Sequence, residues 1–213
     1  MKQTVASVIC LCALALSIAA AQDGPVEPVG IYKTIDVRLA RDTLKALHDF
    51  KGQTRQQVIN AITDKPEDFA PPVLYSLSSV LFEEDKKNEA VFWFYAAQLR
   101  GRIDANICAD KSARGTINEM NEKFGAPINQ YSSRNLPLLN NIVEGVLAWE
   151  ENTPCHYDRR WINLHGSAAM NGDTNAPLSA PQDQWEAIRK RTRDEYRSTF
   201  QEALGEFKKI SKQ

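Results

Sequence analysis

The sequence predicts an all-α protein, either an irregular helical bundle or a repeat-like array of helical hairpins with a long C-terminal helix. Two observations predict this class. Apolar residues recur at three- and four-residue spacing along most of the chain, as they do on one face of a helix. No stretch shows the strict alternation of apolar and polar residues, bounded by turn signals, that is typical of a half-buried strand.

Residues 1–21 have the pattern of a secretory signal peptide. Lys2 precedes an apolar run from Val5 to Ile18, and the alanines at 19–21 are the small residues that signal peptidase requires. The run is shorter than the roughly 20 apolar residues that a membrane-spanning helix needs. We therefore expect export across the inner membrane, most simply to the periplasm, and no stable membrane insertion.

Residues 22–213 are then expected to form a single helical domain, which is a common domain size. Residues 22–30 are polar and contain Pro25 and Pro28, so we predict an extended lead-in there. The whole chain has 26 basic and 27 acidic residues. This balance gives no electrostatic reason to bind nucleic acid or an anionic membrane, and neither is expected as a partner.

Residues 71–105 are the most regularly patterned apolar segment after the leader. The spacing predicts a first helix from Pro72 to Phe82, a polar connection, and a second helix that ends near Gly101. Aromatic residues at 92–95 occupy several faces of the second helix, so it should be covered on several sides. Trp93 is therefore predicted to be a core residue.

This hairpin resembles a single degenerate copy of the Sel-like subclass of tetratricopeptide-type helical repeats. In that family, small residues let two helices pack closely, and an aromatic pair fills the space toward the next repeat. Exported proteins with such repeats often act as specificity or inhibitor partners of other proteins, so the resemblance implies a protein partner. The residues that match the family pattern are Ala90, Trp93, Phe94, Ala96, Ala97, Gly101 and Ala105.

Further helices are predicted on both sides of the hairpin. Before it, one helix runs from about Val37 to Phe50, and a second follows a Thr54 cap and stops at Asp64. The C-terminal helix follows Pro181, spans about 30 residues and is some 45 Å long. Between the hairpin and that helix we expect helices at 103–111, at 116–124 with Gly125 closing it, and at 136–150 with Asn135 as its cap.

Residues 152–180 form the longest segment without a helical pattern. Loops of this length are uncommon in compact domains unless they are functional or disordered. We expect an ordered first half and a mobile second half. The first half contains the residue types that are enriched at interface hot spots, and the sequence predicts that these residues bind a partner. They are Tyr157, Arg159, Arg160 and Trp161.

A structural interpretation of the same residues is also open. In that alternative, Trp161 and Leu164 cover the core beneath the loop, and the arginines pair with nearby carboxylates. Cys108 and Cys155 are the cysteines outside the leader, and in an oxidising compartment such a pair is predicted to form a disulfide. That bond would hold the loop against the body of the domain.

Two functions follow from these patterns. The first is an exported periplasmic protein-binding module, one concrete version being an immunity or inhibitor protein that neutralises a secreted toxin. The second is a small periplasmic hydrolase with a site around His156, Asp158 and His165. The sequence contains no GxSxG, HExxH, P-loop or dinucleotide-binding motif, so no catalytic residue, metal site or cofactor is predicted and binding is preferred.

Overall fold

The computed structural model describes residues 28–172, 175 and 177–210. The predicted signal peptide, residues 1–21, lies outside the described residues, and so do positions 22–27 of the predicted lead-in. The described chain is helical and contains no strand, which confirms the predicted fold class. Its only pairing of strand type is an isolated bridge between Cys108 and Ser179.

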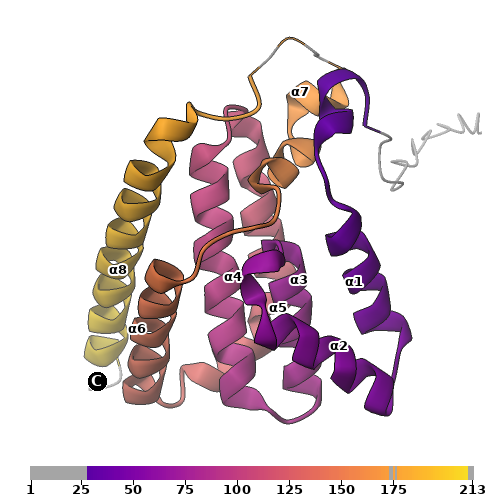
Figure 1. The fold of residues 1–213 in the computed structure, drawn as a ribbon. Coiled ribbons are helices and arrows are strands. Elements are labelled where there is room, and N and C mark those ends of the chain that lie inside the picture. The colour runs from indigo at the N-terminus through magenta and orange to yellow at the C-terminus, as the bar shows by residue number, and fades with distance from the viewer. Residues whose placement is uncertain (1–27, 173–174, 176, 211–213) are drawn as a thin grey trace, which may run out of the picture.

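Helix α4 (Lys87–Ile107) lies at the centre of the fold (Figure 1), and four other long helices pack against it. Helices α1 and α8 lie at opposite edges of the molecule, α1 beside α3 and α8 beside α6. The other long helices are α1 (Arg38–Asp49), α2 (Gly52–Asp64), α3 (Pro71–Glu83), α5 (Gly115–Ser132), α6 (Leu136–Asn152) and α8 (Trp185–Ile210).

Six short helical segments connect these elements. The ones that matter most below are η1, which precedes α1, and η2 and η4, which lie on the two sides of one cleft. Their bounds are η1 (Gly30–Thr34), η2 (Pro66–Asp68), η3 (Lys111–Arg114), η4 (Arg159–His165), α7 (Ser167–Met170) and η5 (Gln182–Gln184).

The predicted central hairpin is present as α3 and α4. Proline occupies the first positions of α3, where its missing N–H costs no hydrogen bond. Asp85 turns the chain between the two helices with a φ of 64°, a left-handed conformation that an aspartate tolerates better than most residues. The alanines at 90, 96 and 97 are fully buried, so the two helices approach each other closely along this face.

Two glycines that were predicted to end helices instead lie inside them. Helix α4 continues through Gly101 to Ile107. Glycine is needed at 101 for packing, because a Cβ there would lie only 2.8 Å from Cδ1 of Ile117. Helix α5 likewise continues through Gly125, where a Cβ would lie 3.0 Å from Cζ of Phe94. These glycines allow α5 to lie close against α4, and the predicted helix ends at Gly101 and Gly125 were wrong.

The other predicted boundaries of helices and loops were partly right. Asn135 caps α6 as predicted, and its Oδ1 accepts a hydrogen bond from the backbone N–H of Leu138 at 3.1 Å. Thr54 is not a cap, because α2 begins at Gly52. The predicted loop at 152–180 contains η4 and α7, so it is partly helical. Positions 173–174 and 176 lie outside the described residues, so the mobility predicted there stays a prediction.

Trp93 lies in the main core, as predicted, with 8 % of its surface exposed. Its ring meets Phe92 and Trp149 edge to face, at centroid distances of 5.1 and 5.6 Å. Trp149 belongs to α6, so this aromatic cluster packs α4 against α6. Aromatic pairs of this geometry add about 0.5–1.5 kcal/mol to the free energy gained from burial.

We expect Trp93→Ala to lower the free energy of unfolding by about 3–5 kcal/mol, because the substitution leaves a cavity between α4 and α6. Chemical denaturation followed by circular dichroism measures this change. Phe207→Ala is the control, because Phe207 is 50 % exposed and its loss should cost much less. Equal effects of the two substitutions would contradict the core position of Trp93.

Candidate functional site

A buried carboxylate organises the segment that was predicted to bind a partner. Asp104 of α4 is 0 % exposed. Its Oδ2 accepts hydrogen bonds from the Tyr157 hydroxyl at 2.9 Å and from Trp161 Nε1 at 2.8 Å, and its Oδ1 accepts one from Arg159 Nε at 2.8 Å. Burial raises the pKa of Asp104 above its usual value, although the charge of Arg159 and these three donors oppose the rise. Because every neighbour donates, the site fits the ionised carboxylate.

A buried guanidinium lies one helical turn before Asp104, on the same face of α4. Arg100 is 0 % exposed and stacks over the Trp149 ring at 4.2 Å. Its Nη2 donates to the backbone oxygens of Thr153 and Pro154, each at 3.0 Å. Arg100 and Asp104 together hold residues 153–161 against α4.

Three of the four predicted binding residues therefore point inward. Tyr157, Arg159 and Trp161 are the side chains that surround Asp104, and Arg159 keeps only 9 % of its side chain exposed. Arg160 instead pairs with Asp158 at 2.7 Å, donates to the Thr34 backbone oxygen at 3.1 Å and keeps 34 % of its side chain exposed. This arrangement matches the structural interpretation: Arg159 and Trp161 are almost fully covered, and Arg160 keeps a partly exposed charge. Binding of a partner by these residues stays a prediction.

The two cysteines are free in the structure, so the predicted Cys108–Cys155 disulfide is not formed. Cys108 is 2 % exposed, and its Sγ lies 3.3 Å from Asn163 Oδ1. The residue before Cys155 is instead held against α4, because its backbone oxygen accepts a hydrogen bond from Arg100 Nη2 at 3.0 Å.

The residues of the hydrolase hypothesis are only partly brought together. His156 and Asp158 line one cleft, in which His156 Nδ1 lies 2.9 Å from Asp68 Oδ1. His165 is not among the residues that line it, and its exposed ring packs edge-on against Trp161 at a centroid distance of 5.8 Å. In the described part of the chain, no group of three or more histidine, cysteine or acidic side chains is arranged to hold a metal ion.

The cleft beside His156 lies between the start of α1, η2 and the segment before η4. It has a volume of about 320 Å³, and we call it the acidic cleft because Asp36, Asp68 and Asp158 line it. Hydrogen bonds from Arg38 lower the pKa of Asp36 to about 2. Partial burial raises the pKa of Asp158, but hydrogen bonds from Arg160 and from the backbone N–H of Asp36 have the larger combined effect. The pKa of Asp158 is therefore lowered. These two carboxyl groups are therefore negatively charged at neutral pH.

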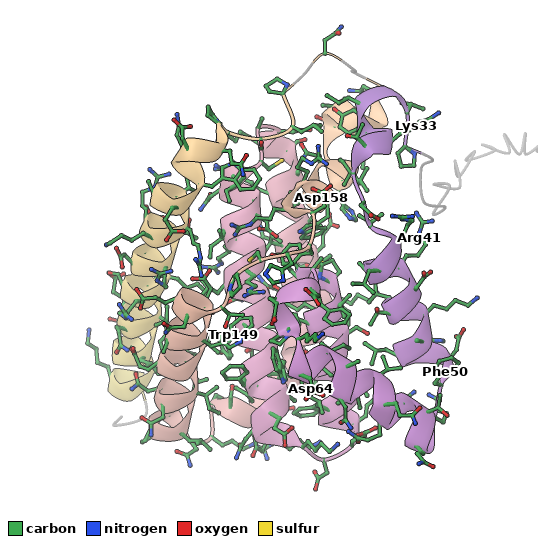
Figure 2. The ribbon with its side chains drawn as sticks, in the orientation of Figure 1. Lys33, Arg41, Phe50, Asp64, Trp149 and Asp158 are labelled. Atoms are coloured by element: carbon green, nitrogen blue, oxygen red, sulfur yellow. The ribbon has the colours of Figure 1, made fainter. Side chains whose placement is uncertain are left out.

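A second cleft adjoins the acidic cleft on the side of η1, and we call it the basic cleft. Its volume is about 450 Å³, and Lys33, Arg38 and Arg41 line it. The two clefts share Asp36 and Val37, so they adjoin at the start of α1. Figure 2 shows Lys33 and Arg41 along this edge, with Asp158 on the neighbouring segment.

Exposed apolar side chains gather on the same edge. Six large hydrophobic residues of the described chain are exposed, and four of them belong to η1 and α1 or border these helices. Leu39, which is 52 % exposed, also lines the acidic cleft. The four are Val29, Ile31, Leu39 and Phe50, and the other two are Met170 and Phe207.

Comparison with known proteins adds no family or relative, because no family model, curated protein or solved structure matches the chain. Among the described helices, none combines the length and apolar character needed to cross a membrane. The site must therefore be interpreted from its own geometry.

No sequence pattern pointed to the residues of the two clefts. Asp36, Lys33 and Arg41 lie near the start of the first helix, whereas Asp68 and Asp158 are 90 residues apart in sequence. Basic residues in the first turn of α1 were the one available signal, because helices favour acidic residues there. Nothing in the sequence indicated that η2 and the segment before η4 meet α1.

We expect Asp104→Asn to destabilise the fold by about 3–5 kcal/mol, because it leaves the Arg159 guanidinium buried without its counter-charge. Thermal and chemical unfolding both measure the loss. Asp194→Asn serves as a matched control, since Asp194 pairs with Lys190 on the exposed face of α8 and its loss should have little effect. A change no larger than that of the control would show that Asp104 is not the anchor of this segment.

The cysteine geometry makes a separate prediction for thiol reactivity. Cys155 is half-buried and should react with a maleimide in the native protein, whereas Cys108 should react only after unfolding. Burial removes Cys108 from the reagent and raises its pKa to about 11, which leaves little thiolate at neutral pH. Mass spectrometry before and after denaturation counts the labels. No label in the denatured, unreduced protein would instead indicate a disulfide.

Proposed function

We propose that the chain is an exported protein-binding module whose partner contacts the edge formed by η1, α1 and the two clefts. The observation that carries this proposal is the gathering of exposed apolar side chains, four of six, within residues 29–50. Exposed apolar side chains that a partner covers together are typical of interaction sites on soluble proteins, and we propose that these four form such a site.

The apolar side chains are suitable anchors for a protein interface. Leu39 and Phe50 are 52 % and 44 % exposed, and their positions along α1 place them near the same side of the helix. Covering the remaining half of each side chain would contribute on the order of 1 kcal/mol per residue. The charged clefts beside them would supply the polar contacts that give an interface its specificity.

The opposite edge of the molecule has a different character. The outer face of α8 carries salt bridges between neighbouring residues of its own, such as Lys190–Asp194 at 2.8 Å. Exposed pairs of this kind contribute little energy, and of the six exposed large apolar residues of the described chain only Phe207 belongs to α8. The α1 edge is therefore the better supported place for a partner to bind.

An immunity or inhibitor protein that neutralises a secreted toxin is one concrete form of this function. Such a role needs a surface that keeps its shape before the partner arrives, since preorganisation reduces the entropy lost on binding. The acidic cleft meets this need, because its wall at Tyr157 and Trp161 is fixed by hydrogen bonds to buried Asp104.

The hydrolase alternative receives some support from the Asp68–His156 pair, which could orient a water molecule in the acidic cleft. The residues that line this cleft include no serine, threonine, cysteine or lysine that could act as a nucleophile. His165, the third residue of that hypothesis, lies elsewhere. Binding therefore remains the function that the geometry supports better.

Affinity capture with a charge in the apolar patch tests the binding proposal. Immobilised wild-type protein, Leu39→Asp and Phe207→Asp would each be exposed to a periplasmic extract of the producing cells. We expect a protein that wild type and Phe207→Asp retain equally and that Leu39→Asp retains at least about tenfold less, a loss of about 1.4 kcal/mol. Phe207 is the matched control, being 50 % exposed on α8 at the far edge.

Unfolding temperatures of the three proteins must agree, so that a binding loss is not a folding loss. Equal retention of every captured protein by wild type and Leu39→Asp would contradict the proposal that the α1 edge binds the partner. Retention that Phe207→Asp abolishes would place the interface on α8 instead.

A further inference from the structure

The acidic and basic clefts adjoin each other, and we consider them together as two halves of one groove. They meet at Asp36 and Val37, which line both. The acidic half is lined by three carboxylates, of which Asp36 and Asp158 are paired with arginines. The basic half is lined by one lysine, two arginines and the shared Asp36. A groove that changes sign along its length distinguishes ligands by the order of their charges as well as by their net charge.

The acidic half has the features of a site for a long cationic side chain. Tyr157 and Trp161 form part of its wall, and the apolar side chains of Val37 and Leu39 lie beside the carboxylates. The methylene stem of a lysine or arginine can pack on such apolar surface while its charged end reaches a carboxylate. Asp68 keeps 37 % of its side chain exposed, so it is accessible to such a group.

The basic half has the features of a site for a carboxylate. In the described part of the chain, no acidic side chain lies within salt-bridge distance of Lys33 or Arg41, whereas Arg38 is paired with Asp36 at 2.8 Å. Helix α1 begins here without an acidic residue in its first turn, and Asp36 Oδ1 accepts a hydrogen bond from only one of its first backbone N–H groups, that of Arg38, at 3.1 Å. Its dipole therefore adds to the positive potential of the two unpaired side chains.

We propose that this groove binds a segment of a protein partner in which a lysine or arginine lies within a few residues of an aspartate or glutamate. The basic side chain occupies the acidic cleft, and the acidic side chain contacts Lys33 and Arg41. This inference rests on the proposed function and adds the chemistry of the recognised segment.

Four blocked heptapeptides of otherwise identical alanine sequence test it. They carry arginine and glutamate two positions apart, arginine with glutamine, glutamine with glutamate, or two glutamines. Each is titrated into the ¹⁵N-labelled protein to about 10 mM, which detects millimolar affinities. We expect the Arg–Glu peptide to shift backbone amide signals in both clefts, each singly charged peptide to shift one cleft, and the Gln–Gln peptide to shift neither.

Variants assign the two halves. Asp68→Asn should weaken binding of the arginine peptides at least about threefold and leave the Gln–Glu peptide unchanged. The double variant Lys33→Gln, Arg41→Gln should have the opposite selectivity, and Lys190→Gln on α8 is the matched control that should alter neither. Absence of shifts with the Arg–Glu peptide, or equal shifts with the Gln–Gln peptide, would overturn the inference. Loss of capture by Leu39→Asp in that case would leave the proposed function standing.

Discussion

The structure depends on two buried charges that lie one turn apart on α4. Arg100 holds backbone oxygens of the segment after α6, and Asp104 accepts hydrogen bonds from the side chains that follow in the same segment. A buried charge is tolerated only where partners compensate its lost hydration. Residues 153–161 supply those partners, so an otherwise irregular stretch has one favourable path across α4.

The same principle attaches the C-terminal helix. Glu150 of α6 is 0 % exposed and pairs with Arg189 at 2.6 Å and Arg193 at 2.8 Å, both on α8. The two networks meet at the Thr153 backbone oxygen, which accepts from Arg100 at 3.0 Å and from Arg189 at 3.2 Å. Helices α4, α6 and α8 are therefore connected through the first residues of the loop. Breaking one of these charge pairs would therefore also weaken the packing of the helix that the other network holds.

These networks explain where the proposed interface lies. Arginine, tyrosine and tryptophan combine a large surface with a polar group, which suits them equally to interface hot spots and to buried polar clusters. At 157–161 the Tyr157 hydroxyl, Arg159 Nε and Trp161 Nε1 all donate to Asp104, and Arg159 Nη2 is buried without a hydrogen-bond partner among the residues that the structure describes. Their role is to fix one wall of the acidic cleft, and the exposed apolar contacts come from η1 and α1 instead.

The sequence alone determined the helical class, the α3–α4 hairpin, the core position of Trp93 and the Asn135 cap, because each depends on spacing or on hydrogen bonds between near neighbours. Tertiary packing decided the rest. Gly101 and Gly125 lie within helices because Ile117 and Phe94 pack against them. The cysteines are free in a loop whose course Arg100 and Asp104 fix, and the acidic cleft exists because that course brings Asp158 beside Asp36. Contacts between residues so distant in sequence leave no periodic signal, so only the folded chain reveals them.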